Sequence, residues 1–472
     1  MSDLVLLDGE LGGVRTDIVV RDGKIAAIER KQRAIARGEA LDCNGGAVIP
    51  ALHDHHVHLL ALAAAKHSVV VGPPAVRTPE ELADVLRCAA ATRRTDEWVR
   101  ATGYHESVGG ELDRWRLDAL VADHPVRVQH RSGALWTLNS RALQEIDVAA
   151  EAVEGVERDA AGEVTGRLFR VDDWLRRRLP PPPPPDLADV ARLLASYGVA
   201  GTTDATPYTD VADIQALADA VRGTKRSLRV TATGGAELAG VRLPAPLLTG
   251  PVKVILDDAR FPSFATLTEV IRAAHEHRRP IAFHCVTEMS AAVVCAALGE
   301  AGTIPGDRIE HGSVIDRKLM PVLASLGVTV VTQPGFVRER GDEYLEEFEG
   351  DAADLYRCGT LIESGIPVGG STDAPFADPD PWRAMSVAVS RLTLGGAALG
   401  PREAIRPARA VALFTSRAGD PGGESRRVAV GAPADLCVLR VPLAAALADL
   451  RSEHVAMTMV GGRVSYDSRE AG

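Results

Sequence analysis

The stretch VIPALHDHHVH at residues 48–58 decides the expected fold, because a short apolar run leads directly into a cluster of histidines. Such a run is typical of a buried strand, and side chains two residues apart on a strand point to the same face. His56 and His58 therefore project together. His53 and His55 have the opposite phase, so we do not expect them to be ligands. Two neutral imidazoles at this spacing can bind one divalent metal, and zinc favours nitrogen donors.

Other polar residues occupy similar places on short apolar runs. His284 follows PIAF, His311 follows RIE, and Asp373 follows PVGGST. Lys253 is the one cation inside the run GPVKVIL. If each run is a strand of a parallel barrel, the carboxyl ends meet at one rim, where active-site loops gather. A lone histidine is more often structural, but the joint pattern predicts a metal site. Its expected ligands are His56, His58, Lys253, His284, His311 and Asp373.

Short apolar segments alternate with helical stretches through the middle of the chain. The segments end near residues 58, 203, 231, 253, 284, 311, 331 and 370. Such alternation predicts an α/β fold, a (β/α)8 TIM barrel. The gap between residues 58 and 203 is too long for one unit, so we expect an α/β insertion over 66–190 with a strand at Val126–His130. The six prolines at 180–185 are expected to form a stiff spacer at its end.

Strand-like segments at both ends of the chain predict one small β domain. The pairs Asp22-Gly23 and Gly461-Gly462 lie between apolar runs, and such pairs favour hairpin turns. We therefore expect residues 1–50 and 408–472 to form a composite β-sandwich domain. The barrel would then span 51–407.

Composition and charge exclude several classes of function. The chain has 472 residues and a net charge of −11, which argues against a nucleic-acid or membrane-surface binder. Its six cysteines form no CxxC pair, as expected in a reducing compartment. The N-terminus lacks the pattern of a signal peptide, and no apolar run is long enough to span a membrane. We expect a cytoplasmic protein whose partner is a small-molecule substrate. A homodimer is compatible with this expectation.

Lys253 lies in an apolar strand, where an unpaired ammonium group is expensive. Desolvation lowers the pKa of a buried lysine and leaves a neutral, nucleophilic amine. That amine can add carbon dioxide, and the resulting carbamate can bridge two metal ions. The alternative is an ion pair with Asp257 or Asp258, which follow closely in the sequence.

The order of these residues along the chain resembles that of the amidohydrolase superfamily of metal-dependent hydrolases. More narrowly, the chain resembles amidohydrolase family 3, the proteins related to N-substituted formamide deformylase. The resemblance extends over nearly the whole chain and rests also on the stretches LWTLNSRAL (135–143), GEVTG (162–166), QP (333–334), STDAP (371–375), DPDPW (378–382) and GAPADL (431–436). One departure concerns a histidine that often precedes the asparagine-serine stretch in the family, where this chain has Ser132-Gly133-Ala134.

The resemblance implies hydrolysis of a non-peptide carbon–nitrogen bond in an amide, an N-formyl or N-acyl amine, or a cyclic amide. One or two divalent ions, by default zinc, would activate water by lowering its pKa. Asp373 would act as general base and then as general acid toward the departing nitrogen. The alternatives are a deaminase with a single metal ion and, third, a non-catalytic scaffold.

Several further residues are candidates for substrate binding. Tyr104 and His105 follow a predicted strand of the insertion and can line a pocket, and Gln333 follows the seventh barrel strand. His130 or Arg131 can replace the missing family histidine. The structural alternatives are a strand cap for His130 and a loop-capping amide for Gln333. Glu310 should face outward by strand alternation and be solvated or salt-bridged.

Overall fold

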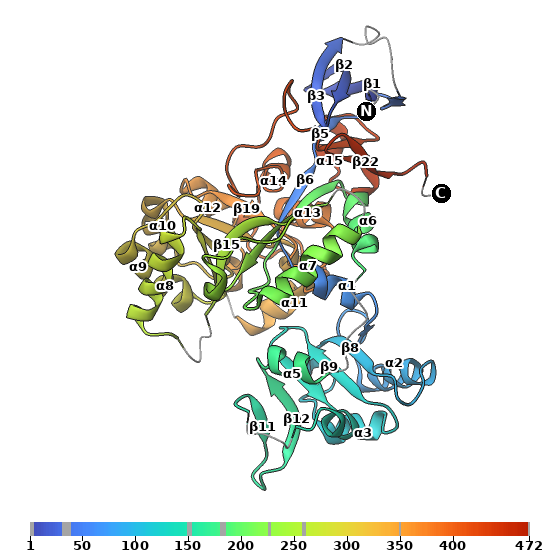
Figure 1. Cartoon of the computed structure of the whole chain (residues 1–472), viewed down its shortest axis with the longest axis vertical. Helices are drawn as coiled ribbons and strands as arrows, with labels where there is room; N and C mark the ends of the chain where they lie inside the picture. The colour runs from blue at the N-terminus through green and yellow to red at the C-terminus, as the bar shows by residue number, and fades with distance from the viewer. Residues whose placement is uncertain are drawn as a thin grey trace. The chain divides into compact units, whose positions relative to one another are not determined.

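The computed structural model describes residues 4–30, 39–148, 153–179, 186–224, 228–256, 261–348 and 351–470. The chain divides into two compact units (Figure 1). The larger unit contains Met1–Leu59 and Asp186–Gly472, and the smaller unit is Leu60–Pro185. The predicted insertion limits of 66–190 lie within a few residues of that division, and the proline run at 180–185 lies outside the described residues.

The larger unit is built around a parallel sheet of eight strands that pair in chain order. The strands are β6 (Leu52–Val57), β13 (Val199–Asp204), β14 (Arg229–Gly234), β15 (Leu248–Ile255), β16 (Ile281–Cys285), β17 (Arg308–His311), β18 (Thr329–Thr332) and β19 (Val368–Gly370). Most of their residues are buried on both faces, which explains their continuous apolar sequence. The predicted (β/α)8 barrel is confirmed.

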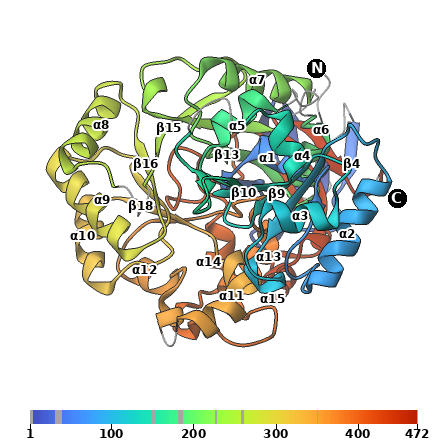
Figure 2. The same ribbon diagram turned by 90° about the horizontal axis from the view of Figure 1, so that it is seen from below.

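The helices of this unit lie outside the barrel strands, as Figure 2 shows for α7 to α10. They are α6 (Ala188–Ser196), α7 (Val211–Gly223), α8 (Phe264–Glu276), α9 (Glu288–Ala301), α10 (Met320–Leu326), α11 (Gly335–Glu347), α12 (Gly359–Glu363), α13 (Pro381–Ser390) and α14 (Pro407–Ala412). Their sequences explain this position. In α8, for example, Leu267, Ile271 and Ala274 form one buried stripe at helical spacing, and Ser263 caps the first turn.

The barrel closes where the chain beyond β19 meets β6. The Asp373 amide donates to the His56 carbonyl at 2.9 Å, and the His58 amide donates to the Ala374 carbonyl at 2.9 Å. The Asp54 carboxylate also joins these segments, because it accepts hydrogen bonds from the Thr372 amide at 3.1 Å and the Thr372 hydroxyl at 2.5 Å. Closure therefore brings the histidine-rich segment beside Asp373.

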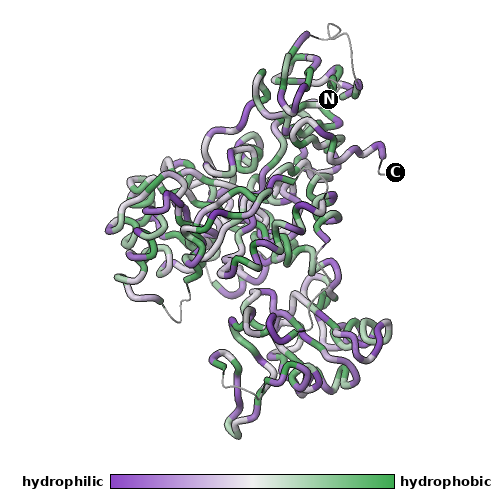
Figure 3. Tube along the Cα trace, in the orientation of Figure 1, coloured by the Kyte–Doolittle hydropathy of each residue, from purple (hydrophilic) through white to green (hydrophobic). Residues whose placement is uncertain are grey.

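Strands from both ends of the chain form two further sheets of four strands each. One contains β1 (Leu4–Leu11), β2 (Val14–Arg21), β3 (Lys24–Arg30) and β4 (Glu39–Asp42), and the other β5 (Val48–Pro50), β20 (Leu436–Leu439), β21 (Val455–Val460) and β22 (Arg463–Asp467). Both predicted hairpins are present, with positive φ at Asp22, Gly23, Gly461 and Gly462. Ile18 and Ile25 of one sheet share a core with Leu436 and Met459 of the other. Figure 3 shows hydrophobic and hydrophilic residues interspersed along these strands, as one-sided sheets require.

The smaller unit is an α/β domain with one sheet in the order β11-β12-β10-β9-β8-β7. Its strands are β7 (Val69–Val70), β8 (Val99–Tyr104), β9 (Val126–His130), β10 (Leu135–Leu138), β11 (Val156–Arg158) and β12 (Val164–Phe169). Its helices are α2 (Pro79–Ala91), α3 (Arg114–Leu120), α4 (Ser140–Glu145) and α5 (Asp172–Arg178), while α1 (Leu59–Ala65) begins at the boundary between the units. The predicted strand Val126–His130 is β9.

The remaining helix, α15 (Leu443–Ala448), follows β20. Among the helices in the described ranges, none combines the length and the apolar character needed to cross a bilayer.

Candidate metal centre

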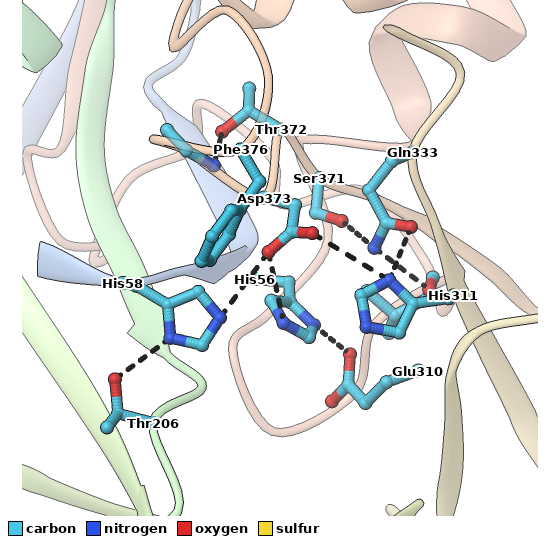
Figure 4. A network of polar contacts seen from close by, with 12 residues as sticks. His56, His58, Thr206, Glu310, His311, Gln333, Ser371, Thr372, Asp373 and Phe376 are labelled. Carbon is cyan, nitrogen blue, oxygen red and sulfur yellow. Dashed lines mark hydrogen bonds and ion pairs between the residues drawn. The ribbon is translucent and has the colours of Figure 1, made fainter. Parts of the chain in front are cut away.

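The structure brings the predicted barrel histidines together at the carboxyl ends of their strands, and Figure 4 shows three of them, His56, His58 and His311, around Asp373. The rings form a continuous group, with centroid distances of 5.3 Å for His56–His58, 4.8 Å for His56–His311 and 4.5 Å for His284–His311. One potential ligand atom each from His56, His58 and Asp373 lies within 4.8 Å of the other two. Segments more than 300 residues apart in the sequence thus meet at one rim of the barrel.

Asp373 lies beside three of these rings. Its Oδ1 atom is 3.5 Å from His56 Nε2 and 3.4 Å from His58 Nε2, and its Oδ2 atom is 3.9 Å from His311 Nδ1. Burial by itself would raise the pKa of Asp373, but the neighbouring histidines outweigh burial and hold that pKa well below its usual range. Oδ1 is buried and has no hydrogen-bond partner among the described residues.

Two of the candidate ligands have unusual backbone conformations. His311 has φ of +69° and Asp373 has φ of +59°, both in the left-handed region that residues other than glycine seldom adopt. Such strain is typical of functional sites, where the surrounding structure maintains it. His311 is the last residue of β17, and Asp373 lies three residues beyond the end of β19.

The outer nitrogen of three histidines has a protein partner. His56 Nδ1 lies 2.5 Å from Glu310 Oε2, His58 Nδ1 lies 2.9 Å from the Thr206 hydroxyl, and His311 Nδ1 lies 3.0 Å from Gln333 Oε1. A carboxylate can only accept, so His56 Nδ1 carries a proton. Burial lowers the pKa of His56, and the neutral ring then has its lone pair on Nε2. That lone pair faces the unpartnered Asp373 Oδ1, an arrangement that is unfavourable unless a cation lies between them.

Glu310 differs from its prediction. Its side chain is fully buried instead of solvated, and its second oxygen accepts from Arg308 Nε at 2.6 Å. The ion-pair alternative is therefore correct and the solvated one is wrong. The prediction placed Glu310 opposite His311, but the left-handed backbone of His311 takes the His311 side chain out of the strand alternation, so both residues contact His56.

Lys253 is 3% exposed, and its Nζ atom has no hydrogen-bond partner among the described residues. Burial lowers the pKa of its ammonium group, and the nearby Glu310 opposes that shift only in part. Asp257 and Asp258, the alternative partners, lie outside the described residues. Burial also lowers the pKa of His284, and it lowers that of His311 to about 3, so both imidazoles are neutral at pH 7, as metal ligation requires.

Comparison with known proteins agrees with this geometry. A sequence model described as the amidohydrolase family matches residues 39–466. This chain belongs to the amidohydrolase family. N-substituted formamide deformylase from Arthrobacter pascens is 25% identical, with 99% of each chain covered. An uncharacterized metal-dependent hydrolase from Pyrococcus furiosus shares the fold, with a TM-score of 0.69, 20% identity, and coverage of 93% of this chain and 99% of that one. The predicted enzyme class, an amidohydrolase, is confirmed.

Two side chains of this amidohydrolase that were predicted to bind substrate are already engaged within the protein. Gln333 is fully buried; its Oε1 faces His311 and its Nε2 donates to the Ser371 hydroxyl at 2.9 Å. Tyr104, in the smaller unit, is also buried and donates from its hydroxyl to the Gly110 carbonyl at 2.6 Å. A substrate role for either residue stays a prediction.

The smaller unit contains a second group of potential ligands, His105, Glu106 and His130. His130 Nδ1 accepts from the Ser132 amide at 3.1 Å, which leaves the ring proton on Nε2, and Nε2 donates to Glu106 Oε2 at 3.1 Å. Arg131 Nη2 lies 2.8 Å from His105 Nε2, where a cation would be repelled. This group is satisfied by hydrogen bonds and does not have the electronic arrangement of a metal site.

The residues that contact the site are predictable from the amino-acid sequence to different degrees. Asp54 carried a signal, since it is two residues before His56 and so shares its face. Arg308 and Glu310 lie two apart on β17, a pattern equally typical of a surface ion pair. Thr206 carried no signal, because a threonine after a strand is common.

Proposed function

We propose that this amidohydrolase is a metal-dependent hydrolase of a non-peptide carbon–nitrogen bond in a small amide, N-formyl or N-acyl amine, or cyclic amide. One observation carries the proposal: the lone pair of His56 Nε2 faces the unpartnered Asp373 Oδ1 at 3.5 Å in a buried site. A divalent cation between the two atoms would convert that repulsion into two ligand bonds.

The ligand set we propose is His56, His58, Lys253, His284, His311 and Asp373. Its nitrogen-rich composition favours zinc over calcium or magnesium. When bound, the ion supplies Lewis acidity to the substrate carbonyl and lowers the pKa of water toward neutrality.

Asp373 is the proposed proton carrier. Its low pKa keeps the carboxylate ionised at neutral pH, so it can accept the proton of the attacking water. The same carboxylate then donates that proton to the nitrogen as the carbon–nitrogen bond breaks. The backbone contact between the Asp373 amide and the His56 carbonyl, at 2.9 Å, keeps the carboxylate beside the histidines throughout.

Lys253 is proposed to carry a carbamate. Its buried, unpartnered Nζ supports this, because a neutral amine adds to the carbon of carbon dioxide and releases one proton. The product is an anion that can bridge two metal ions. An unmodified Lys253 with one metal ion would instead favour the deaminase alternative.

N-formyl amines are the first substrates to test, because the full-length relative from Arthrobacter pascens is an N-substituted formamide deformylase. Tyr104, His105, His130, Arg131 and Gln333 stay proposed substrate contacts. A small molecule is the proposed partner, and homodimer formation stays a prediction.

The decisive experiment combines metal analysis with a substrate screen. Purified protein is stripped with a chelator, reloaded with zinc, manganese or iron, and assayed on N-formyl, N-acyl, cyclic-imide and aminopurine compounds. We expect release of amine from the first three classes, and loss of activity after chelation. Ammonia released from aminopurines alone would indicate the deaminase. Fewer than about 0.5 metal ions per chain, with no chelator-sensitive activity, would indicate the scaffold.

A further inference from the structure

We propose that Glu310 is a positioning residue, which holds His56 in one tautomer and one orientation and is itself held by Arg308. This inference rests on the proposed function, since it assigns a role toward the metal. The three side chains form a buried line in which His56 Nδ1 lies 2.5 Å from Glu310 Oε2 and Arg308 Nε lies 2.6 Å from Glu310 Oε1. Their exposed fractions are 1%, 0% and 2%.

Glu310 differs from the other outer partners in its charge. Thr206, beside His58, has a hydroxyl that can either donate or accept, so it leaves the tautomer of that ring open. Gln333, beside His311, presents a neutral amide oxygen. Glu310 presents an anion that can only accept, and a charged acceptor makes the stronger hydrogen bond. Within the described residues, His56 is therefore the histidine of the site whose proton is fixed most firmly on Nδ1.

Arg308 makes this arrangement possible. Its guanidinium lies 2.6 Å from Glu310 Oε1 and compensates the buried negative charge of Glu310. A fully buried ion pair of this kind contributes little net stability, because desolvation of both charges offsets their attraction. The ion pair contacts the candidate ligand His56 through Glu310, and this contact gives the pair a role other than stability.

Replacement by glutamine shows why the charge matters. In Glu310→Gln, one end of the side chain is an oxygen and the other an NH2 group. If the oxygen keeps the Arg308 hydrogen bond, the NH2 group meets His56 Nδ1 and drives the ring proton to Nε2, toward Asp373. If the oxygen instead accepts the hydrogen bond from His56 Nδ1, the NH2 group faces the Arg308 guanidinium, and two donors meet. Either outcome weakens the lone pair that would bind a metal.

A matched control exists in the same unit. Glu403 is another buried glutamate paired with a buried arginine, with Arg357 Nη1 at 3.0 Å from Glu403 Oε1. Within the described residues, the Glu403 side chain accepts hydrogen bonds from Arg357 and Thr360 and from no histidine. Glu403→Gln therefore removes a comparable buried charge without touching the site.

The experiment measures zinc affinity of the full-length apo protein by competition with a chromophoric chelator, alongside the melting temperature of the apo protein. We expect Glu310→Gln to lose about tenfold to a hundredfold in affinity, and Glu403→Gln to bind as the wild type does. Wild-type affinity in Glu310→Gln, or an equal loss in both variants, would overturn the positioning role alone. A wild-type protein that binds no zinc, manganese or iron would overturn the proposed function as well.

A second measurement avoids the risk that Glu310→Gln fails to fold. Nitrogen-15 spectra of the histidine rings in the wild-type apo protein report the tautomer directly, and His56→Gln identifies the His56 signals by their loss. A proton on Nδ1 supports the proposal, and a proton on Nε2 contradicts it.

Discussion

Two clusters in this amidohydrolase contain the same kinds of side chain and have opposite chemical character. In the barrel, His56 and His58 lie with Asp373, and in the smaller unit His105 and His130 lie with Glu106; both groups have potential ligand atoms within 4.8 Å of one another. In the barrel group the side chains of His56, Asp373 and His58 are 1%, 8% and 19% exposed, whereas Glu106 in the smaller unit is 40% exposed.

The difference lies in what contacts each Nδ1 atom. The carboxylate beside His56 Nδ1 leaves a lone pair on Nε2, and the amide beside His130 Nδ1 leaves a proton there. When Nε2 has a lone pair, the histidine and the carboxylate beside it attract a cation. When Nε2 has a proton, the two groups form a hydrogen bond and need no cation. Outer partners, more than residue type, separate a candidate metal site from a polar cluster.

The largest expected effect comes from the carboxylate of the barrel cluster. Asp373→Asn should lower turnover roughly a thousandfold, because the proton carrier is lost while the volume is kept. Turnover is measured on the best substrate of the screen, with metal content determined on the same samples. If metal stays bound and turnover falls less than about tenfold, Asp373 is not the proton carrier. Glu106→Gln in the other cluster is the matched control, expected to retain metal.

Metal affinity should separate the two clusters next. His56→Ala should weaken zinc binding by more than about a hundredfold, since a ligand matters more than an outer partner. His130→Ala should leave zinc affinity and stoichiometry unchanged, because its Nε2 is a donor. Competition titration of both variants checks this. An equal loss of zinc affinity in His56→Ala and His130→Ala would indicate that the smaller unit also binds a metal ion.

A smaller effect is expected on stability. Zinc at a hundredfold excess over its Kd should stabilise the folded protein by about 2.7 kcal/mol, because the ion binds the native state. Calorimetry with and without chelator should show this shift in the wild type and in His105→Ala. The shift should be absent in His56→Ala, and its persistence there would contradict the barrel site.

The smallest expected effect is the pH dependence of the apo protein. Burial lowers the pKa of His311 and of His55 to about 3 in the folded state, against about 6.5 for a histidine in the unfolded chain. Between these values the unfolded chain binds more protons, so stability should be constant above about pH 6.5 and fall toward about pH 3. Urea titrations across this range test the slope. His311→Gln should flatten it more than His105→Gln, whose imidazole is 17% exposed; equal slopes would refute the assignment.

Much of the site was predictable because a barrel imposes one rule on every strand. Residues at the carboxyl ends of parallel strands meet at one rim, so the positions of His284, His311 and Asp373 after apolar runs sufficed to group them. The rule fails for Glu310, where a left-handed neighbour breaks the alternation on which its predicted orientation depended. The rule makes no prediction for Thr206, which contacts His58 from a loop whose course depends on the fold.

The sequence by itself determined two things about this protein. It determined that the apolar strands form a barrel, and which polar side chains lie at the ends of those strands. Periodicity carries that information because it is local, two residues per repeat along a strand. The tertiary structure alone decided the protonation state of the histidines. That state depends on whether a carboxylate, an amide or a hydroxyl lies against each Nδ1, and in the barrel these partners come from distant segments of the chain, as Glu310 does to reach His56.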